Sequence, residues 1–343
     1  MDKRSRLSVG PVSVAISPQS LMVTGLIFIA CSALVLLALS IGSVDIPPAT
    51  VIRSLLGTEN GPEAFVIEVL RLPRIVMGFL VGAALGVSGL ILQSVVRNPL
   101  ASPDIIGISG GASVAAVAFL SFLAPSVGSH WLPVMAIAGA MIAAAIIYLL
   151  AWQQGVTPAR LVLIGIGLSA AMGAATTLMI TLSPITTTMT AYIWLTGSIY
   201  GSDWDDVSAF LPWMAALLPL ALASGRTIDL QEFGDTLATG LGLAVQRNRL
   251  LLLFLSVALA GSAVAYAGAI GFVGLIAPHI ARKLVTRHFT ALAPVAAMIG
   301  GALVVAADLI GRTLFDPLDL PAGVFVSAVG APFFIYLLFR QRY

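Results

Sequence analysis

The sequence predicts an all-α integral membrane protein with about ten transmembrane helices, and three observations support that fold class. First, 59% of the 343 residues are hydrophobic and only 9% are charged, whereas a soluble domain carries about 25% charged residues. Second, apolar runs long enough to cross a bilayer recur along the whole chain. Third, basic residues gather in alternate connections between those runs, as the positive-inside rule requires.

The first apolar run covers residues 21–41 and follows a basic tail over residues 1–20. The run has about the length needed to cross a bilayer and is longer than the apolar core of a typical signal peptide. We therefore expect a retained first helix, a cytoplasmic N-terminal tail over 1–20, and a single transmembrane domain over 21–343.

Nine further apolar runs predict helices 2 to 10. They cover about residues 75–95, 106–125, 132–152, 160–182, 205–224, 249–268, 271–286, 290–310 and 322–339. Their interiors are rich in alanine and glycine, as in "VGAALGVSGL" and "IAGAMIAAAII". Small residues let helices approach closely in lipid, where burial of apolar area no longer drives association. We therefore interpret most of these glycines as packing residues.

The basic residues orient the predicted helices. With the N-terminus in the cytoplasm, 13 of the 17 Lys and Arg residues fall on the inner side and 4 on the outer side. The four outer residues are Arg53, Arg71, Arg74 and Arg312. Both termini are then cytoplasmic, and helices 2–5 and 7–10 form two blocks of opposite orientation. Inverted repeats of this kind are common in transporters.

Several kinds of chemistry are excluded by residues the chain lacks. The stretch "RNPLASPDIIGISGGAS", residues 97–113, resembles a phosphate-binding loop, but it has no lysine, and a Walker A loop needs one. Neither of the two lysines, Lys3 and Lys283, follows a glycine loop. We therefore expect no nucleotide hydrolysis on this chain, which is not an enzyme by this reasoning. The single cysteine, Cys31, provides neither a disulfide nor a zinc site, and we expect no metal on this chain.

Three polar features inside or beside the apolar runs have two readings each. The predicted spans are almost free of carboxylates, which argues against ion-coupled transport, although Asp308 near the outer end of helix 9 leaves that alternative open. We interpret His279 as a structural histidine rather than as a ligand or proton relay. We interpret "DWDD", residues 203–206, as a cap of the following helix rather than as a cation site, because carboxylates favour helix N-termini.

Three longer stretches resemble the signature regions of one family. They are "RLPRIVMGFLVGAALGVSGLILQSVVRNPLASPDIIGISGGA" (71–112), "GAIGFVGLIAPHIAR" (268–282) and "AADLIGRTLFDPLDLPAGVFVSAVGAPFFIYLL" (306–338). From about residue 20 to its end, the chain is similar to the permease subunits of ferric-siderophore and vitamin B12 ABC importers. Within that family, "RNPLASPD" and "LLAWQQGVTPARLVLIGIG" look most similar to permeases for ferric enterobactin-type siderophores. The resemblance implies the ten-helix fold of type II importers.

The resemblance also implies partners. A second permease subunit completes the pathway, as a heterodimer by first choice and with a homodimer left open. Two ATP-binding subunits carry ATP and Mg, so that no cofactor is expected on this chain, and no nucleic acid is expected as a partner. An extracytoplasmic siderophore-binding protein docks outside, where family arginines pair with its glutamates; the matching positions are Arg71, Arg74 and Arg312. In the alternative reading, Arg71 and Arg74 only anchor helix 2 at the interface.

Residues after helix 2 match the family's cytoplasmic gate. The Asn-Pro-Leu turn maps to Asn98, Pro99 and Leu100, and Arg97 marks the inner end of helix 2. A second gate element precedes helix 5, where the vitamin B12 permease has small hydroxylated residues and this chain has Pro158 and Ala159. Helices 5 and 10 are expected to line the pathway.

Helix 3 follows the predicted gate turn. We expect Asp104 to favour the start of that helix, and Gly107, Gly110 and Gly111 to pack it closely against its neighbours.

The segment between helices 6 and 7, about residues 230–247, resembles the family's coupling segment, which sits in a cleft of the ATPase. Its small-residue pattern falls on Gly234, Ala238, Leu241 and Gly242, which predicts two short helices joined by tight turns. The alternative is an ordinary amphipathic helix lying on the membrane surface.

We therefore expect a permease subunit in the bacterial cytoplasmic (inner) membrane. It would pass a ferric siderophore, catecholate and enterobactin-like by first choice, into the cytoplasm with energy from ATP hydrolysed on partner chains. The same machinery carrying vitamin B12 or haem is the nearest alternative. A secondary transporter and a membrane scaffold without transport activity are the others.

Overall fold

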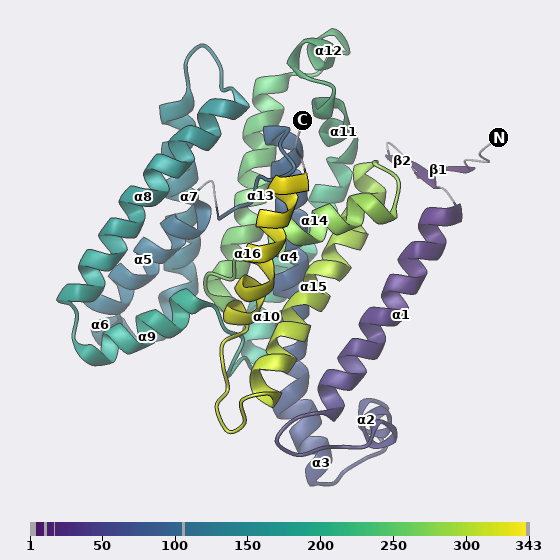
Figure 1. Ribbon diagram of the computed structural model, residues 1–343, viewed down its shortest axis with the longest axis vertical. Coiled ribbons are helices and arrows are strands. Elements are labelled where there is room, and N and C mark those ends of the chain that lie inside the picture. The colour runs from purple at the N-terminus through teal and green to yellow at the C-terminus, as the bar shows by residue number, and fades with distance from the viewer. Residues whose placement is uncertain (1–4, 10–11, 17, 105–106, 341–343) are drawn as a thin grey trace.

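The computed structural model describes residues 5–9, 12–16, 18–104 and 107–340, which form a helical bundle (Figure 1). Ten helices correspond to the ten predicted ones, which confirms the fold class. They are α1 (Pro18–Ser40), α4 (Leu72–Val96), α5 (Ile108–Phe122), α7 (Leu132–Ala151), α8 (Pro158–Leu182), α10 (Trp204–Ala223), α13 (Val245–Ala267), α14 (Val273–Leu284), α15 (Phe289–Thr313) and α16 (Ala322–Arg340).

Short helices and one hairpin occupy the connections. The helices are α2 (Pro48–Leu55), α3 (Pro62–Phe65), a π-helical stretch (Val66–Arg71), α6 (Ala124–Val127), a 3-10 turn (Ser129–Trp131), α9 (Ile185–Thr196), α11 (Gly225–Glu232) and α12 (Asp235–Gly240). In the predicted tail, β1 (Ser5–Val9) pairs antiparallel with β2 (Val12–Ile16). We call the end of the bundle that carries α2 and α3 the α2 end, and the opposite end the α11 end (Figure 1).

Two of the predicted spans are shorter helices than the hydropathy suggested. Eight helices of the described chain are long and apolar enough to cross a membrane, but α5 has 15 residues and α14 has 12. At about 1.5 Å per residue, α14 is too short for a hydrocarbon core of about 30 Å. The apolar loop "GAIG" before α14 is not helical, and hydropathy counts its residues without regard to their backbone conformation.

The helix contacts support the predicted inverted repeat of helices 2–5 and 7–10. The contact of α4 with α15 has its counterpart in that of α13 with α7, and the contact of α5 with α7 has its counterpart in that of α14 with α15. The central pair, α4 and α13, pack against each other. The two short helices are also counterparts, and each follows a residue with positive φ, Gly107 (88°) or Phe272 (65°).

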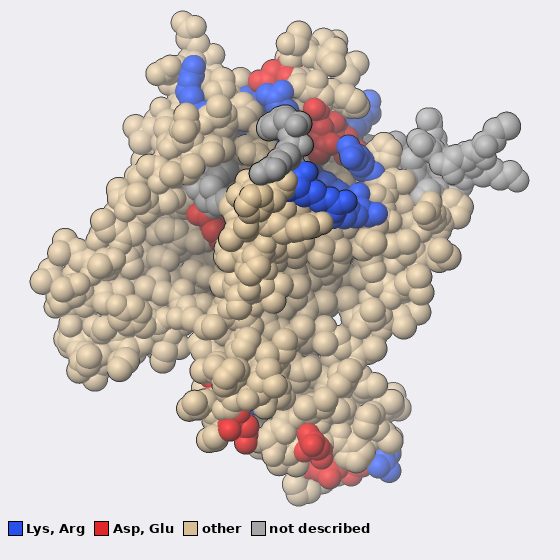
Figure 2. Space-filling model, in the orientation of Figure 1, with Lys and Arg blue, Asp and Glu red and all other residues tan. Residues whose placement is uncertain are grey.

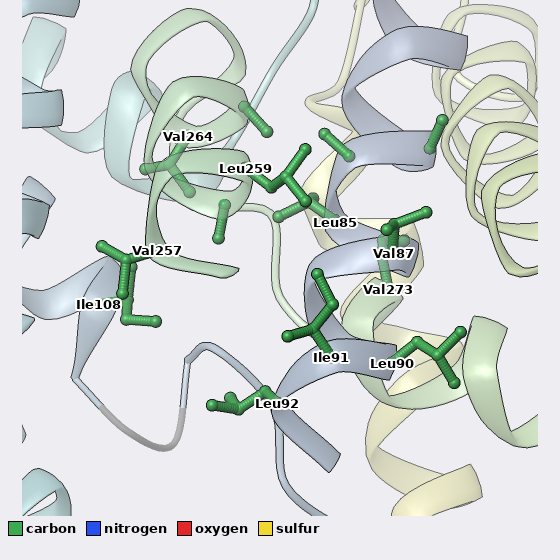
Figure 3. Close-up of a cluster of buried hydrophobic side chains, with 14 of the residues drawn as sticks. Leu85, Val87, Leu90, Ile91, Leu92, Ile108, Val257, Leu259, Val264 and Val273 are labelled. Atoms are coloured by element: carbon green, nitrogen blue, oxygen red, sulfur yellow. The ribbon is translucent and has the colours of Figure 1, made fainter. Parts of the chain in front are cut away.

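The core lies along α4 and α13. The apolar window of the helical stretch that ends in α4 is 83% buried, against 11% for α1 and for α8. Figure 3 shows Leu85 of α4 beside Leu259 of α13, with Val273 of α14 next to Val87 of α4. The outer helices therefore present apolar side chains to lipid or to other subunits.

Glycines permit the close crossings of α4. A Cβ on Gly89 would collide with the carbonyl oxygen of Gly274 in α14, and a Cβ on Gly82 would collide with that of Gly300 in α15. Backbone cannot move aside as a flexible side chain can, so these positions accept only glycine. The packing interpretation is confirmed for these residues.

The glycines at the start of α5 also pack closely. Gly107 has the positive φ that glycine tolerates, and a Cβ on Gly110 would lie 3.1 Å from Cε of Met172. A Cβ on Gly111 would lie 2.6 Å from the carbonyl oxygen of Gly139, so α5 and α7 meet backbone to backbone.

Candidate functional site

Charged side chains gather at the two ends of the bundle and leave a nearly uncharged belt between them (Figure 2). At the α2 end, the three predicted docking arginines lie together around one cavity of about 630 Å³. Arg71 is the last residue of the π-helical stretch before α4, Arg74 lies at the start of α4, and Arg312 lies at the end of α15. Tyr200 and Asp319 also line this cavity.

Arg71 is used inside the protein. Its residue is only 6% exposed, and Nη1 donates to the carbonyl oxygens of Leu39 and Ser40 at 2.6 and 3.3 Å. Nη2 donates to the carbonyl oxygen of Val44 at 2.6 Å. These bonds satisfy carbonyls at the end of α1 and in the following loop, which no further helical turn satisfies.

Arg74 lies between two carboxylates. Its Nε and Nη2 donate to Asp308 Oδ1 at 2.9 and 2.7 Å, and its Nη1 and Nη2 donate to the two oxygens of Asp319 at 2.7 Å each. The guanidinium also lies 5.3 Å from the ring centroid of Tyr200, within the range of a cation–π contact. Arg312 completes the cluster, with Nε 3.7 Å from Asp308 Oδ2.

Arg53, the fourth basic residue predicted for the outer side, lies 3.7 Å from Glu59. All four of these residues therefore have acidic or carbonyl partners within this chain. These pairings could not be predicted from the sequence, because Asp308 and Asp319 lie more than 200 positions from Arg74. Contact of these arginines with a binding protein stays a prediction, and the buried Arg71 is the least accessible of them.

The predicted gate residues form a tight turn at the α11 end. The backbone N–H of Leu100 donates to Asn98 Oδ1 at 2.9 Å, and that of Ala101 donates to the Asn98 carbonyl oxygen at 3.1 Å. Arg97 ends α4 with a φ of 54°, a left-handed conformation that lets the chain leave the helix at once. The predicted turn over Asn98, Pro99 and Leu100 is confirmed as a turn, and its role as a gate stays a prediction.

Asp104 accepts hydrogen bonds from the starts of two helices. Its Oδ1 accepts from Ser109 Oγ of α5 at 2.8 Å, and its Oδ2 accepts from the backbone N–H of Phe272, just before α14, at 3.2 Å. Asp104 was expected to support the start of helix 3. The structure adds a bond to the corresponding helix of the second repeat.

The predicted coupling segment, about residues 230–247, contains the end of α11, the short helix α12 and the start of α13, and α12 lies at the tip of the bundle (Figure 1). Gly234 precedes α12 with a φ of 94°, and Gly242 follows it with a φ of 84°, so both turns need glycine. Ala238 is fully buried, whereas Leu241 is exposed. The side chains of Phe233 and Leu237 are exposed as well, so α12 and the residues that flank it carry an apolar surface beyond the transmembrane helices.

Ion pairs connect the coupling segment to the bundle. Asp235 Oδ1 lies 2.7 Å from Nη2 of Arg249 and 3.2 Å from Nη2 of Arg97. Glu232 Oε1 accepts from Ser94 Oγ at 2.8 Å. Neither carboxylate was among the predicted site residues, although two acidic residues in a segment flanked by arginines were a usable signal.

The two remaining polar features have structural partners. Asp203 and Asp206 form a capping box at the start of α10, in which Asp203 Oδ1 accepts from the backbone N–H of Asp206 at 2.9 Å; the predicted cap is confirmed. His279 packs edge-on against Phe333 with ring centroids 5.6 Å apart. Among the described residues, no group of three or more His, Cys, Asp and Glu side chains is arranged to hold a metal ion.

Comparisons with known proteins agree with this architecture. Residues 28–340 match the FecCD transport family. The chain is 53% identical over 311 residues to the achromobactin transport system permease protein CbrC of Dickeya dadantii, covering 91% of this chain and 89% of that one. It is 41% identical over 328 residues to the iron(3+)-hydroxamate import system permease protein FhuG of Bacillus subtilis, covering 94% and 98%.

A solved structure shares the fold. A chain described as an inward-facing metal-chelate type ABC transporter superposes with a TM-score of 0.83 at 27% identity, covering 93% of this chain and 99% of that one. The relatives above are named for achromobactin and hydroxamates, so the enterobactin-like specificity suggested by the sequence is not confirmed. The chain belongs to the FecCD transport family, the permease subunits of ABC importers for iron chelates and cobalamin.

Proposed function

We propose that this chain is one permease subunit of an importer that moves a ferric siderophore into the cytoplasm, with ATP hydrolysed on partner chains. The observation that carries the proposal is the exposed apolar surface on α12 and the residues beside it, formed by Phe233, Leu237 and Leu241 beyond the spanning helices. Large apolar side chains exposed outside the bilayer are typical of a protein–protein contact. An ATPase subunit that receives α12 in a cleft would cover them.

The orientation follows from the charges. The α11 end carries most of the basic residues, including Arg97, Arg249 and Arg282, so it is the cytoplasmic end by the positive-inside rule. Both α1 and α16 have their terminal ends there (Figure 1), which agrees with two cytoplasmic termini. The α2 end then faces outward, and its arginine-lined cavity is the proposed contact with the siderophore-binding protein.

A second permease subunit would cover one side of the bundle. The exposed residues of α8 include the small or polar Gly167, Gly173 and Thr177, together with large apolar residues such as Leu163 and Leu178. Large apolar residues suit lipid, and small residues suit a close subunit contact or a pathway wall. We infer a heterodimer with α8 and α16 along its pathway, and a homodimer is the other outcome of the assembly test.

An ion-coupled secondary transporter is disfavoured by the surroundings of Asp308. That carboxylate is only 3% exposed and lies 2.7 Å from Nη2 of Arg74. A carboxylate held by two arginines has little freedom to bind and release a proton or cation during each transport cycle.

Uptake in proteoliposomes tests the proposal. This chain would be co-expressed with its second permease, ATPase and binding protein, and uptake would be measured with labelled iron complexes of achromobactin, a catecholate, a hydroxamate and citrate, and with vitamin B12. We expect ATP-dependent uptake of at least one ferric chelate by the full complex only. Uptake by this chain alone without ATP, or vitamin B12 as the sole cargo, would contradict the proposal.

A further inference from the structure

We propose that Asp235 joins the coupling helix α12 to both gate segments, so that movement of α12 reaches both sides of the cytoplasmic gate through one carboxylate. This inference rests on the proposed function. Asp235 is the first residue of α12, and its Oδ1 pairs with two arginines that belong to different parts of the bundle. Any displacement of α12 therefore acts on both arginines at once.

The first connection runs to the turn after α4. Arg97 Nη2 lies 3.2 Å from Asp235 Oδ1, and Arg97 immediately precedes Asn98 of the gate turn. The guanidinium also lies against Gly234, where a Cβ would be 3.1 Å from Arg97 Nη1. Glycine before α12 thus serves the turn and leaves room for this arginine. Only the left-handed Arg97 separates α4 from the turn. Because no flexible linker lies between them, a displacement of the Arg97 side chain displaces the turn as well.

The second connection runs to the loop before α8. Arg249 of α13 lies 2.7 Å from Asp235 Oδ1 through Nη2, and its Nη1 donates to the carbonyl oxygen of Val156. The backbone N–H of Val156 donates in turn to Gln246 Oε1 at 2.9 Å. Val156 lies two residues before Pro158, where α8 begins. This loop is the second predicted gate segment.

Burial makes the second connection strong. The side chain of Arg249 is only 1% exposed, and Asp235 is its acidic partner in the described chain. A buried guanidinium without a counter-charge is costly, so Arg249 has to follow the carboxylate or lose its charge partner. The Arg97 side chain is 33% exposed, so its pair with Asp235 is weaker and depends more on salt.

Glu232 strengthens the same attachment at the other end of the Gly234 turn. It accepts from Ser94 of α4 at 2.8 Å, and its Oε1 lies 3.9 Å from Nη2 of Arg282 in α14. Two carboxylates on either side of a glycine turn thus hold the coupling segment to three helices of the bundle, α4, α13 and α14. Asp235 is the carboxylate whose partners contact or adjoin the two predicted gate segments.

The number of cargo molecules imported per ATP hydrolysed tests whether Asp235 transmits movement of α12 to the gate segments. A contact that only stabilised the fold would leave this ratio unchanged. The complete complex would be compared with complexes carrying Asp235→Asn, Arg97→Gln, and both together. Arg287→Gln is the matched control, because Arg287 is an exposed arginine at the same end of the bundle, outside the coupling segment and with no ion pair among the described residues. Melting temperature and subunit stoichiometry would be recorded for each complex.

We expect Asp235→Asn to lower import per ATP about fivefold, which corresponds to a modest coupling free energy, while ATP hydrolysis continues. Arg97→Gln should lower the ratio less, and the double variant should fall no further than Asp235→Asn, because both changes break the same connection. Arg287→Gln should keep the unmodified ratio.

An unchanged ratio in an assembled Asp235→Asn complex would overturn the inference while leaving the proposed function in place. Should Asp235→Asn fail to assemble, the assembled Arg97→Gln complex decides the question, and an unchanged ratio in that complex would overturn the inference. An unmodified complex without ATP-dependent uptake would remove the proposed function and this inference together.

Discussion

Arg74 and Asp319 face each other through two parallel hydrogen bonds, each 2.7 Å long, beside the cavity at the α2 end. This is the geometry in which arginine binds a carboxylate most firmly. A glutamate of a binding protein would need the same edge of the guanidinium, because Asp308 holds the other edge. Docking through Arg74 would therefore exchange an internal carboxylate for an external one.

Asp319→Asn is expected to strengthen docking of the binding protein by about two- to fivefold at low salt, because the competing negative charge is removed. Affinity of the purified binding protein for the complex in nanodiscs would be measured at two salt concentrations. Asp316→Asn is the control, since Asp316 lines the same cavity and has no ion pair among the described residues. Equal affinities of both variants at low salt would exclude the exchange.

Asp308→Asn is expected to destabilise the protein by about 3 kcal/mol, because Arg74 and Arg312 would keep their buried charges without their shared partner. The side chain of Asp308 is 3% exposed, against 28% for Asp319, so Asp319→Asn should cost much less. Thermal unfolding in detergent would compare the two variants. The buried pair would be energetically unimportant if both melted at the same temperature.

Gly89→Ala is expected to abolish accumulation of folded protein, because the added methyl group meets the Gly274 carbonyl oxygen. Gly25→Ala is the matched change in α1, where a Cβ has no neighbour within 4 Å. It should be neutral or stabilise the helix by up to about 1 kcal/mol. Membrane yield and monodispersity on size exclusion would be compared, and normal folding of Gly89→Ala would refute the close crossing.

Leu237→Glu is expected to weaken binding of the ATPase subunits at least tenfold, because it places a charge on the exposed apolar face of α12. The fold should survive, since this side chain is not part of the core. Co-purification of the ATPase and melting of the isolated permease would be measured together. Retained co-purification would show that the ATPase binds the permease at another surface.

Much of the fold follows from local signals in the sequence. Hydropathy places the ten helices, and the glycines at 234 and 242 mark turns whose positive φ the structure confirms. Asn98-Pro99 predicts the turn after α4 for the same kind of reason, because each signal acts within a few residues along the chain. The shortness of α14 escaped prediction, since an extended apolar loop and an apolar helix have the same hydropathy.

The sequence by itself determined that this protein is a helical membrane protein and which family its motifs match, and its charges predict an orientation. Only the tertiary structure decided that Arg74 meets Asp308 and Asp319, and that Asp235 meets Arg97 and Arg249. The physical reason is that an arginine attracts any carboxylate at the same distance equally. Helix packing decides which carboxylate comes within hydrogen-bonding distance, and that packing depends on glycine contacts between segments far apart in the chain.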